Sequence, residues 1–273
     1  MNQQISIATY NVQFSQHPEK IIENVLHMVR SGVSILCLQE VVNRKESVIK
    51  TLLSDLGNSW EAACYFGKEN NILGMGNCIV WDTKAVSAKS KHFELLPYSQ
   101  KLAIHEKAIS LLASGITSPF KRRMVLINFS INGTNFCVVN IHLDHNGGTA
   151  NRLKQLDHVI RSLKKNNRSE KTIICGDFNC LDLLNNGTEY SSYKKLLGHE
   201  YNEATENIDW TADLHDIDTS IGNKIFGKLI RILKIHVRKK LDFIWTRNIK
   251  LKKCEKLDVQ GSDHKPVIAE LSI

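Results

Sequence analysis

The chain has 273 residues, of which 42% are hydrophobic and 23% charged, a composition typical of a soluble globular protein and unlike that of a disordered or fibrous one. It contains no Pro-, Gly- or Ser-rich linker, so we expect a single domain over residues 1–273. The formal net charge of +8 favours polyanionic partners, either nucleic acid or an anionic membrane surface.

Seven cysteines are spread along the chain without a Cys-x-x-Cys pair, at positions 37, 64, 78, 137, 175, 180 and 254. This pattern argues against a zinc ribbon or a disulfide framework. It favours buried thiols in a reducing compartment and no disulfide-linked partner. The N-terminus shows neither a signal peptide nor a long apolar run. We therefore expect a cytoplasmic protein, with export by a route that needs no signal peptide left open. The sequence does not predict an oligomeric state.

The first third of the chain contains a predicted strand–helix–strand unit. Residues 5–10 are predicted to form a strand, and Pro18 to begin a helix that ends at Ser31-Gly32. Residues 33–38 form a continuous apolar strand, and a second helix follows at about 44–56. Between Trp60 and Leu96 we expect several short strands, and over 97–120 a long loop.

A second strand–helix–strand unit follows a predicted hairpin. The strands 122–129 and 135–143 are joined by Asn132-Gly133, a strong hairpin signal. A helix from about residue 150 to 163 leads into a buried strand that starts at Thr172. A short helix at 191–197 and strands at 241–245 and 266–271 complete the chain. This mixture of hairpins and crossovers predicts a mixed α/β sandwich and not a purely parallel sheet.

Seven polar side chains lie at or beside the ends of these predicted strands: Glu40, His142, Asp177, Asn179, Asp242, Asp263 and His264. Carboxylates without thiolates suit a hard ion such as Mg²⁺ or Mn²⁺, and imidazoles beside them suit proton transfer or charge stabilisation. Together they predict metal-assisted attack of water on a phosphate ester. Any one of these motifs alone could be an ordinary turn, but several at strand ends favour a site.

The same residues fall into an ordered set of short motifs: Tyr10-Asn11, Leu38-Gln-Glu40, Asn140-Ile-His-Leu143, Gly176-Asp-Phe-Asn179, Leu241-Asp-Phe-Ile244 and Ser262-Asp-His264. This set resembles the endonuclease/exonuclease/phosphatase superfamily, which includes deoxyribonuclease I-like enzymes, and it runs from residue 5 to 271. The resemblance implies one catalytic domain with a four-layer α/β sandwich, in which two packed mixed β-sheets are flanked by helices. It also implies a metal-dependent phosphoric ester hydrolase.

The resemblance implies that Glu40 is the principal ligand of Mg²⁺, or of Mn²⁺, with Asn11 and Asp263 assisting. If Asp263 and His264 are extended, their side chains point to opposite faces of the chain. Asp242, on a separate strand, is therefore the better candidate to fix the tautomer of the His264 imidazole.

The remaining roles carried over from the family concern the water and the phosphate. Asp177 would orient or deprotonate the attacking water, and Asn179 would hold the scissile phosphate. His142 would stabilise the charge of the phosphorane-like state or protonate the leaving group. His264 would contact the phosphate as a base or as an electrostatic partner.

Substrate contacts are predicted on both sides of this set. Asn77 resembles a family position near the phosphate, although an amide at the start of a strand explains it equally well. Arg122 and Arg123 could reach a phosphate bidentately, and of the two Arg123 is the predicted substrate contact.

The basic segment 221–240 precedes the Asp242 strand and contains no acidic residue. Its residues Lys228, Arg231, Lys234 and Arg238 are predicted to hold a nucleic-acid backbone or an anionic lipid surface. The alternative is an amphipathic helix that packs on the core and exposes a solvated basic face.

The motifs narrow the substrate without fixing it. Val41 and Val42 after Glu40 argue against the exonuclease III-like enzymes, and the strand 241–244 lacks the Cys-Asp-Arg pattern of inositol polyphosphate 5-phosphatases. We expect a phosphodiesterase or nuclease that acts on nucleic acid. The alternatives are a lipid-directed phosphodiesterase or phosphatase, of the sphingomyelinase or phosphoinositide type, and an inactive binding module of the same fold.

Overall fold

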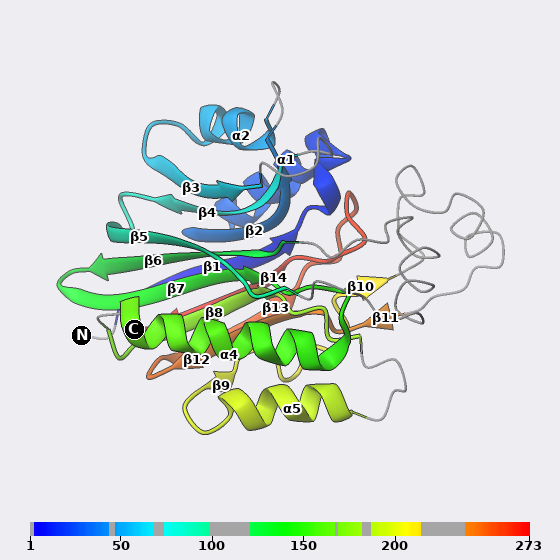
Figure 1. Ribbon diagram of the computed structural model, residues 1–273. Coiled ribbons are helices and arrows are strands. Elements are labelled where there is room, and N and C mark those ends of the chain that lie inside the picture. The colour runs from blue at the N-terminus through cyan, green and yellow to red at the C-terminus, as the bar shows by residue number, and fades with distance from the viewer. Residues whose placement is uncertain are drawn as a thin grey trace, which may run out of the picture.

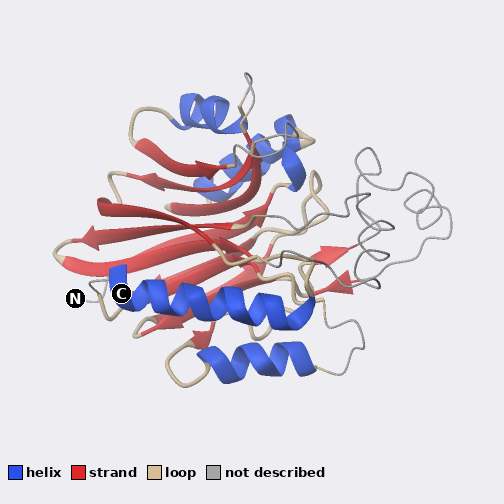
Figure 2. Ribbon diagram, in the orientation of Figure 1, coloured by secondary structure: helices blue, strands red, loops and turns tan. Residues whose placement is uncertain are grey.

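The computed structural model describes residues 3–43, 47–67, 74–98, 121–166, 169–181, 187–213 and 238–273. Within these ranges the chain forms two six-stranded mixed sheets that pack face to face (Figure 1). Figure 2 shows that helices cover the outer side of each sheet, which gives four layers. The four-layer α/β sandwich predicted from the sequence is confirmed.

The first sheet is built around a parallel pair of strands, β1 and β2, joined through a helix. All its other neighbours are antiparallel. Its strands, from edge to edge, are β13 (Lys250–Lys256), β14 (Val267–Ser272), β1 (Gln4–Asn11), β2 (Ile35–Val42), β4 (Met75–Asp82) and β3 (Trp60–Phe66).

The second sheet repeats this plan around the parallel pair β7 and β8. Its order is β5 (Ser87–Leu95), β6 (Arg123–Ile131), β7 (Thr134–His142), β8 (Thr172–Asp177), β12 (Asp242–Arg247) and β9 (Asn202–Glu203). A small separate sheet pairs β10 (Ala212–Asp213) with β11 (Arg238–Lys239). Figure 1 shows this small sheet at the end of the sandwich opposite the chain termini.

Four α-helices among the described residues cover the sheets. The helices α1 (Pro18–Arg30) and α2 (Val48–Leu56) pack on the first sheet, and α4 (Gly148–Asn166) and α5 (Thr188–Leu197) on the second. A short 3-10 turn, η1 (Gln13–Ser15), follows β1. The helix α1 begins with a proline at its first turn, as predicted, because that position needs no N–H donor.

Three apolar clusters fill the spaces between the layers. One lies between the two sheets, one between the second sheet and α4 and α5, and one between the first sheet and α1 and α2. Strand β2 shows why its sequence is continuously apolar. Ile35 and Cys37 face the other sheet, whereas Leu36 and Leu38 face the helices. Because both faces of β2 are buried, its sequence shows no alternation of polar and apolar residues.

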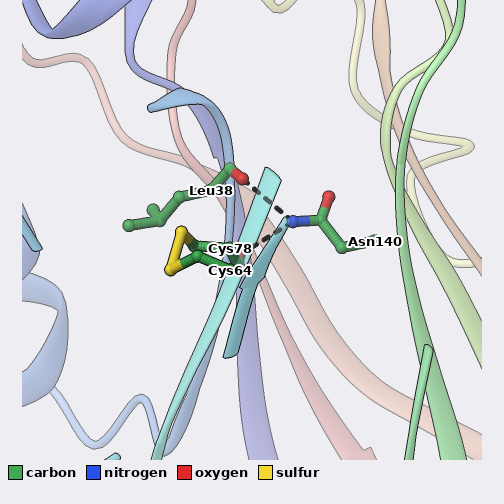
Figure 3. The surroundings of a disulfide bond; sticks show 4 residues. All are labelled: Leu38, Cys64, Cys78 and Asn140. Atoms are coloured by element: carbon green, nitrogen blue, oxygen red, sulfur yellow. Dashed lines mark hydrogen bonds between the residues drawn. A yellow bond between two sulfur atoms is a disulfide. The ribbon is translucent and has the colours of Figure 1, made fainter. Parts of the chain in front are cut away.

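A buried amide joins the two sheets near one end of the sandwich. Asn140 of β7 is fully buried, and its Nδ2 donates to Leu38 O at 2.9 Å and to Cys78 O at 2.8 Å (Figure 3). Its Oδ1 accepts from Gln39 Nε2 at 2.7 Å. One side chain of the second sheet therefore binds the backbones of β2 and β4 in the first. We call these contacts the amide clasp.

The expectation that every cysteine is a free thiol is wrong for two of them. Cys64 of β3 and Cys78 of β4 form a disulfide beside the amide clasp (Figure 3). The antiparallel register places these residues directly opposite each other, which their separation of 14 residues does not reveal. The other five cysteines form no disulfide with one another in the described part of the chain, and four of them are buried.

Two strand regions differ from the sequence-based expectation. The stretch from Trp60 to Leu96 forms three full strands, β3, β4 and β5, and not several short ones. The edge strand β13 was not predicted, because its Lys-rich sequence is largely exposed and gives no core signal. Most of the loop expected at 97–120 lies outside the described residues. No helix within the described ranges is long and apolar enough to cross a membrane.

Candidate active site

Strand register brings three of the predicted site residues side by side. His142 ends β7, Asp177 ends β8 and Asp242 begins β12, and the register pairs His142 with Asp177 and Asp177 with Asp242. Asn140, Cys175 and Ile244, each two positions further into its strand, face the other sheet, so these three side chains continue that face at its edge. Residues 142, 177 and 242 therefore meet at one end of the sandwich.

Gly176 allows the chain to reach this geometry. Its φ is +139°, and a Cβ at this position would lie 1.9 Å from Ile141 O. After it, Asn179 adopts a left-handed conformation with φ +49°, which asparagine tolerates better than most residues. Its backbone N–H donates to Asp177 Oδ1 at 2.8 Å, and its Nδ2 donates to Leu143 O at 2.9 Å. The turn thus fixes the Asp177 carboxylate instead of leaving it to solvent.

A β-bulge directs Glu40 toward the same place. The register between β2 and β4 shifts between Leu38 and Val41, so one extra residue is inserted in β2. Leu38 and Val41 both face the helices, and Glu40 between them has a φ of +57°. A bulge re-aims a side chain and is frequent next to active sites. The Glu40 side chain, 13% exposed, lies with Oε1 3.8 Å from His142 Nε2.

One oxygen of Asp177 is the meeting point of the site. Asp177 Oδ2 accepts from Asn11 Nδ2 at 2.9 Å, and it lies 3.4 Å from His142 Nε2 and 3.9 Å from His264 Nε2. The Asn11 Oδ1 accepts from the backbone N–H of Gln13. The side-chain amide of Asn11 therefore orients Asp177, while its predicted role as a metal ligand stays a prediction.

His264 is held by contacts from three parts of the chain. Its Nδ1 lies 2.7 Å from Asp242 Oδ2, the juxtaposition that the sequence predicts. Its backbone N–H donates to Ser262 Oγ, which itself donates to Asn11 O at 2.7 Å. Asp263 is half-buried, and its carbonyl accepts from the backbone N–H of Asp213. Hydrogen bonds thus join the loop that carries His264 to the end of β1 at Asn11 and to β10 at Asp213.

Three carboxylates of the candidate site lie close together and are largely buried, and their pKa values are raised. Burial raises the pKa of Glu40 to about 7, an effect that Arg122 opposes and the negative charge of Asp263 reinforces. Burial likewise raises the pKa of Asp177 to about 6, against the opposing charge of His264. The pKa of Asp263 is also raised, chiefly by burial. Negative charge at this edge is therefore only partly compensated by the protein's own cations.

The two histidines are shifted in opposite directions. Burial lowers the pKa of His142 well below its usual value, and the positive charge of Arg122 adds to the effect. Burial also opposes a charge on His264, but the carboxylates of Asp242 and Asp177 outweigh it and raise the pKa of His264 well above its usual value. His142 is thus kept neutral, and His264 is kept protonated.

A hard cation fits this donor chemistry. Glu40 and Asp263 offer oxygen ligands with no thiolate nearby, and their raised pKa values show charge that a cation would compensate. In the part of the chain that the structure describes, no group of three or more His, Cys, Asp or Glu side chains is placed so that it could hold a metal ion by itself. Mg²⁺ is commonly held by one or two carboxylates, with water as its other ligands.

The predicted substrate contacts lie in different surroundings. Asn77 donates to Arg123 O at 2.8 Å, and both residues line a small cavity together with His142. The Arg123 guanidinium donates to Lys121 O and lies 5.4 Å from the Tyr65 ring. These two residues are therefore next to His142, at the edge of the candidate site.

The basic segment is described only at its end. Lys228, Arg231 and Lys234 lie outside the described residues. Arg238 is 51% exposed and pairs with Asp213 at 3.2 Å. Its guanidinium also stacks over the Trp210 ring, 4.5 Å from its centre. Arg238 thus lies on the small β10–β11 sheet. This sheet is joined to the His264 loop by the hydrogen bond from the Asp213 backbone N–H to the Asp263 carbonyl.

Sequence reasoning missed the contacts of Arg122. We considered Arg122 only as one of two arginines that could reach a phosphate or lie exposed at a strand edge, but its guanidinium is buried and faces two imidazoles, His142 and His145. No sequence signal pointed to His145, which lies in the loop after the motif Asn140-Ile-His-Leu143. The presence of Arg122 directly before β6, the strand that pairs with β7, was the available hint.

Comparison with known proteins identifies the fold. Residues 8–264 match the family model described as Endonuclease/Exonuclease/phosphatase family. No curated protein matches the chain in sequence. Among similar solved structures is an endonuclease/exonuclease/phosphatase family protein from Bacteroides thetaiotaomicron, with a TM-score of 0.70 and 18% identity over 100% of this chain and 99% of that one.

Two other similar structures carry different activities in their names. One is D. rerio TDP2 complexed with a single-strand DNA product, with a TM-score of 0.69, 15% identity, and coverage of 99% of this chain and 100% of that one. The other is a mannosyl-6-phosphatase from Bacteroides thetaiotaomicron, with a TM-score of 0.64, 15% identity, and coverage of 98% and 100%. At these identities the likeness shows a common fold and not a common substrate.

Proposed function

Since the chain belongs to the endonuclease/exonuclease/phosphatase family, whose members are phosphoric ester hydrolases, we propose that it is a Mg²⁺-dependent phosphodiesterase that acts on nucleic acid. Mn²⁺ is the alternative ion. The observation that carries the proposal is the meeting of His142, Asp177 and His264 at one carboxylate oxygen, with Asp242 behind His264.

Asp177 has the properties of the group that accepts a proton from water. Its pKa of about 6 makes it largely ionised at neutral pH yet more basic than an ordinary aspartate. Asn11 and the backbone N–H of Asn179 each bond one of its oxygens, so its orientation is fixed before substrate binds. A water beside Asp177 Oδ2 would lose its proton to this oxygen as it attacks phosphorus.

His264 supplies positive charge to the phosphate. Its Nδ1–H donates to Asp242, so the Nε2–H of the protonated ring is directed to the site. This N–H can donate to a phosphoryl oxygen while negative charge accumulates there. Asp242 orients the ring and stabilises its charge, as the third member of a catalytic triad does.

Glu40 and Asp263 would hold the metal ion. When bound, Mg²⁺ supplies Lewis-acid polarisation of the phosphate ester and compensates the charge of the surrounding carboxylates. Glu40 reaches the site only through the bulge in β2, which supports a ligand role for this residue. Positive φ is costly for a glutamate, and such strained residues cluster at functional sites.

Nucleic acid is the substrate class that the charge favours. The chain has a formal net charge of +8, and Arg123 lies beside His142 at the catalytic edge. One structure of similar fold, TDP2, contains a single-strand DNA product. Lys228, Arg231 and Lys234, with Arg238, remain the proposed backbone contacts. The alternatives are an anionic lipid substrate and an inactive binding module.

The test is product release from plasmid DNA, RNA and DNA oligonucleotides, sphingomyelin and phosphoinositides, with Mg²⁺ and then with EDTA. We expect cleavage of a nucleic acid, loss with EDTA, and a fall of about 10²–10⁴-fold in kcat for Asp177→Asn and for His264→Ala. Asp82→Asn, at the other end of β4, is the control and should retain activity. Activity only on a lipid would replace the substrate, and equal behaviour of all variants would refute catalysis.

A further inference from the structure

Arg122 lies directly behind one catalytic histidine. This residue is 3% exposed, and its Nη1 lies 3.1 Å from His142 Nδ1. Its Nη2 lies 2.9 Å from His145 Nδ1, and its Nε lies 3.9 Å from Asp144 Oδ1. A buried guanidinium thus contacts two imidazoles through separate nitrogens, one at the end of β7 and one in the loop that follows it.

The chemistry of arginine fixes the direction of these hydrogen bonds. A guanidinium has five N–H donors and no acceptor, so each Nδ1 that it contacts must be the acceptor. A neutral imidazole that accepts at Nδ1 carries its proton on Nε2. In His142 this Nε2–H faces Asp177 Oδ2 at 3.4 Å and Glu40 Oε1 at 3.8 Å. Because carboxylate oxygens are acceptors, these contacts also place the proton of the His142 ring on Nε2.

The other histidine of the site has the opposite arrangement. His264 presents Nδ1 to the Asp242 carboxylate, an acceptor, so its Nδ1 is the donor. A carboxylate behind a ring favours the imidazolium, whereas a guanidinium behind a ring disfavours it. The site therefore contains one histidine whose Nδ1 faces an anionic acceptor, Asp242, and one whose Nδ1 faces a cationic donor, Arg122.

We propose that Arg122 is a positioning residue that holds His142 as the neutral Nε2–H tautomer, so that His142 acts only as a hydrogen-bond donor to the phosphate. The proposal rests on the proposed function for its catalytic part. A ring fixed in this way has no free lone pair at Nε2 to accept a proton. Donating its proton outright would create an imidazolate, so proton transfer is left to Asp177 and His264.

This assignment decides between two roles that the family resemblance leaves open for His142. Stabilisation of charge on the phosphoryl oxygens agrees with a fixed neutral donor. Protonation of the leaving group does not, since it requires an imidazolium. Arg122 would thus contribute without touching substrate, because its guanidinium is occupied by the two imidazoles on the inner side of the loop.

The direct test is the tautomer of His142, observed by long-range ¹H–¹⁵N correlation spectra of protein labelled with ¹⁵N-histidine. The spectra are recorded at pH 7.5 with and without Mg²⁺, and His142→Gln identifies the resonances. We expect a protonated Nε2 and an unprotonated Nδ1 in the wild type. A protonated Nδ1 in the wild type would overturn the proposal, whether or not the protein cleaves nucleic acid.

Variants of Arg122 supply the second test. Arg122→Met removes the donors, and we expect a mixture of His142 tautomers and a fall of about 10²-fold in kcat with KM changed less than threefold. Arg122→Lys retains a donor and should keep the Nε2–H tautomer and most of the activity. Arg247→Leu, at the far end of β12, is the control. If Arg122→Met lowers stability but leaves the tautomer unchanged, Arg122 is structural and the proposal fails.

The two tests separate this proposal from the proposed function. A protein without hydrolase activity on any substrate still reports the tautomer in its spectra. An active protein whose His142 titrates freely in the wild type would keep the proposed function and lose the role of Arg122. If Arg122→Met does not fold, the wild-type and Arg122→Lys spectra decide the matter.

Discussion

Replacing Asn140 with leucine should destabilise the protein strongly, because it removes the amide clasp without changing the shape of the side chain much. Two buried carbonyls, of Leu38 and Cys78, would lose a donor at 2.9 and 2.8 Å. Gln39 would lose one of three acceptors. A buried group left without its partner costs about 1–3 kcal/mol. We expect Asn140→Leu to lower the free energy of unfolding by about 2–5 kcal/mol, after the gain from the larger apolar side chain.

Asn128→Leu is the matched control within the same sheet. Asn128 of β6 is 8% exposed, and its Nδ2 donates to Ser90 Oγ and Asn166 O near the edge of the sandwich. Water can reach these partners when the amide is removed, so the loss should be about 1 kcal/mol. The difference between the two variants measures the cost of leaving buried carbonyls inside the inter-sheet core.

Urea unfolding followed by tryptophan fluorescence gives both free energies, and calorimetry gives a second measure. For a chain of this size about 1 kcal/mol corresponds to about 2–4 °C, so Asn140→Leu should melt about 4–20 °C below the wild type. The reasoning is refuted if the two variants are equally stable, or if Asn140→Leu lies within about 1 kcal/mol of the wild type with an unchanged slope in urea.

Two further predictions concern the conformation and the charge of the site. Gly176→Ala should lower the free energy of unfolding by at least about 3 kcal/mol, since its Cβ would lie 1.9 Å from Ile141 O. Gly133→Ala, with φ +84° and open space around the Cβ, should lower it by about 1–2 kcal/mol. Equal losses in urea unfolding would contradict this. Glu40 has a pKa raised from 4.5 to about 7, so its folded-state proton contributes stability that is full below pH 4.5 and lost as the pH rises through 7. Between pH 4.5 and 8 the free energy of unfolding of the metal-free wild type should therefore fall by about 2–4 kcal/mol relative to that of Glu40→Gln. Mg²⁺ should reduce this difference at pH 8. A difference that stays constant with pH would show that the pKa of Glu40 is not raised.

Strand and helix periodicity predicted the mixed α/β class, and the resemblance of short local motifs to the family implied the four layers and the candidate site residues. Gly176 marks its own turn, and Asp242 could be assigned to His264 because alternate residues of an extended segment face opposite sides. The disulfide of Cys64 could not be predicted in the same way, since it depends on which strands pair and in which register. The partner of Arg122 was missed for a similar reason, because its contacts are set by tertiary packing and not by spacing.

The bulge in β2 has a consequence for which changes the protein can tolerate. Because the bulge inserts one residue, Val41 lies on the same face of β2 as Leu38, three positions earlier, and packs against the helices in a cluster that does not include Glu40. Substitution of Glu40 can therefore change the chemistry of the site while the neighbouring layer stays packed. Deletion of the same residue would place Val41 two positions after Leu38, again on the side that faces the helices, so it would remove the bulge and the Glu40 carboxylate while Val41 kept its layer. The bulge therefore serves to present residue 40 to the site and is not needed to bury Val41.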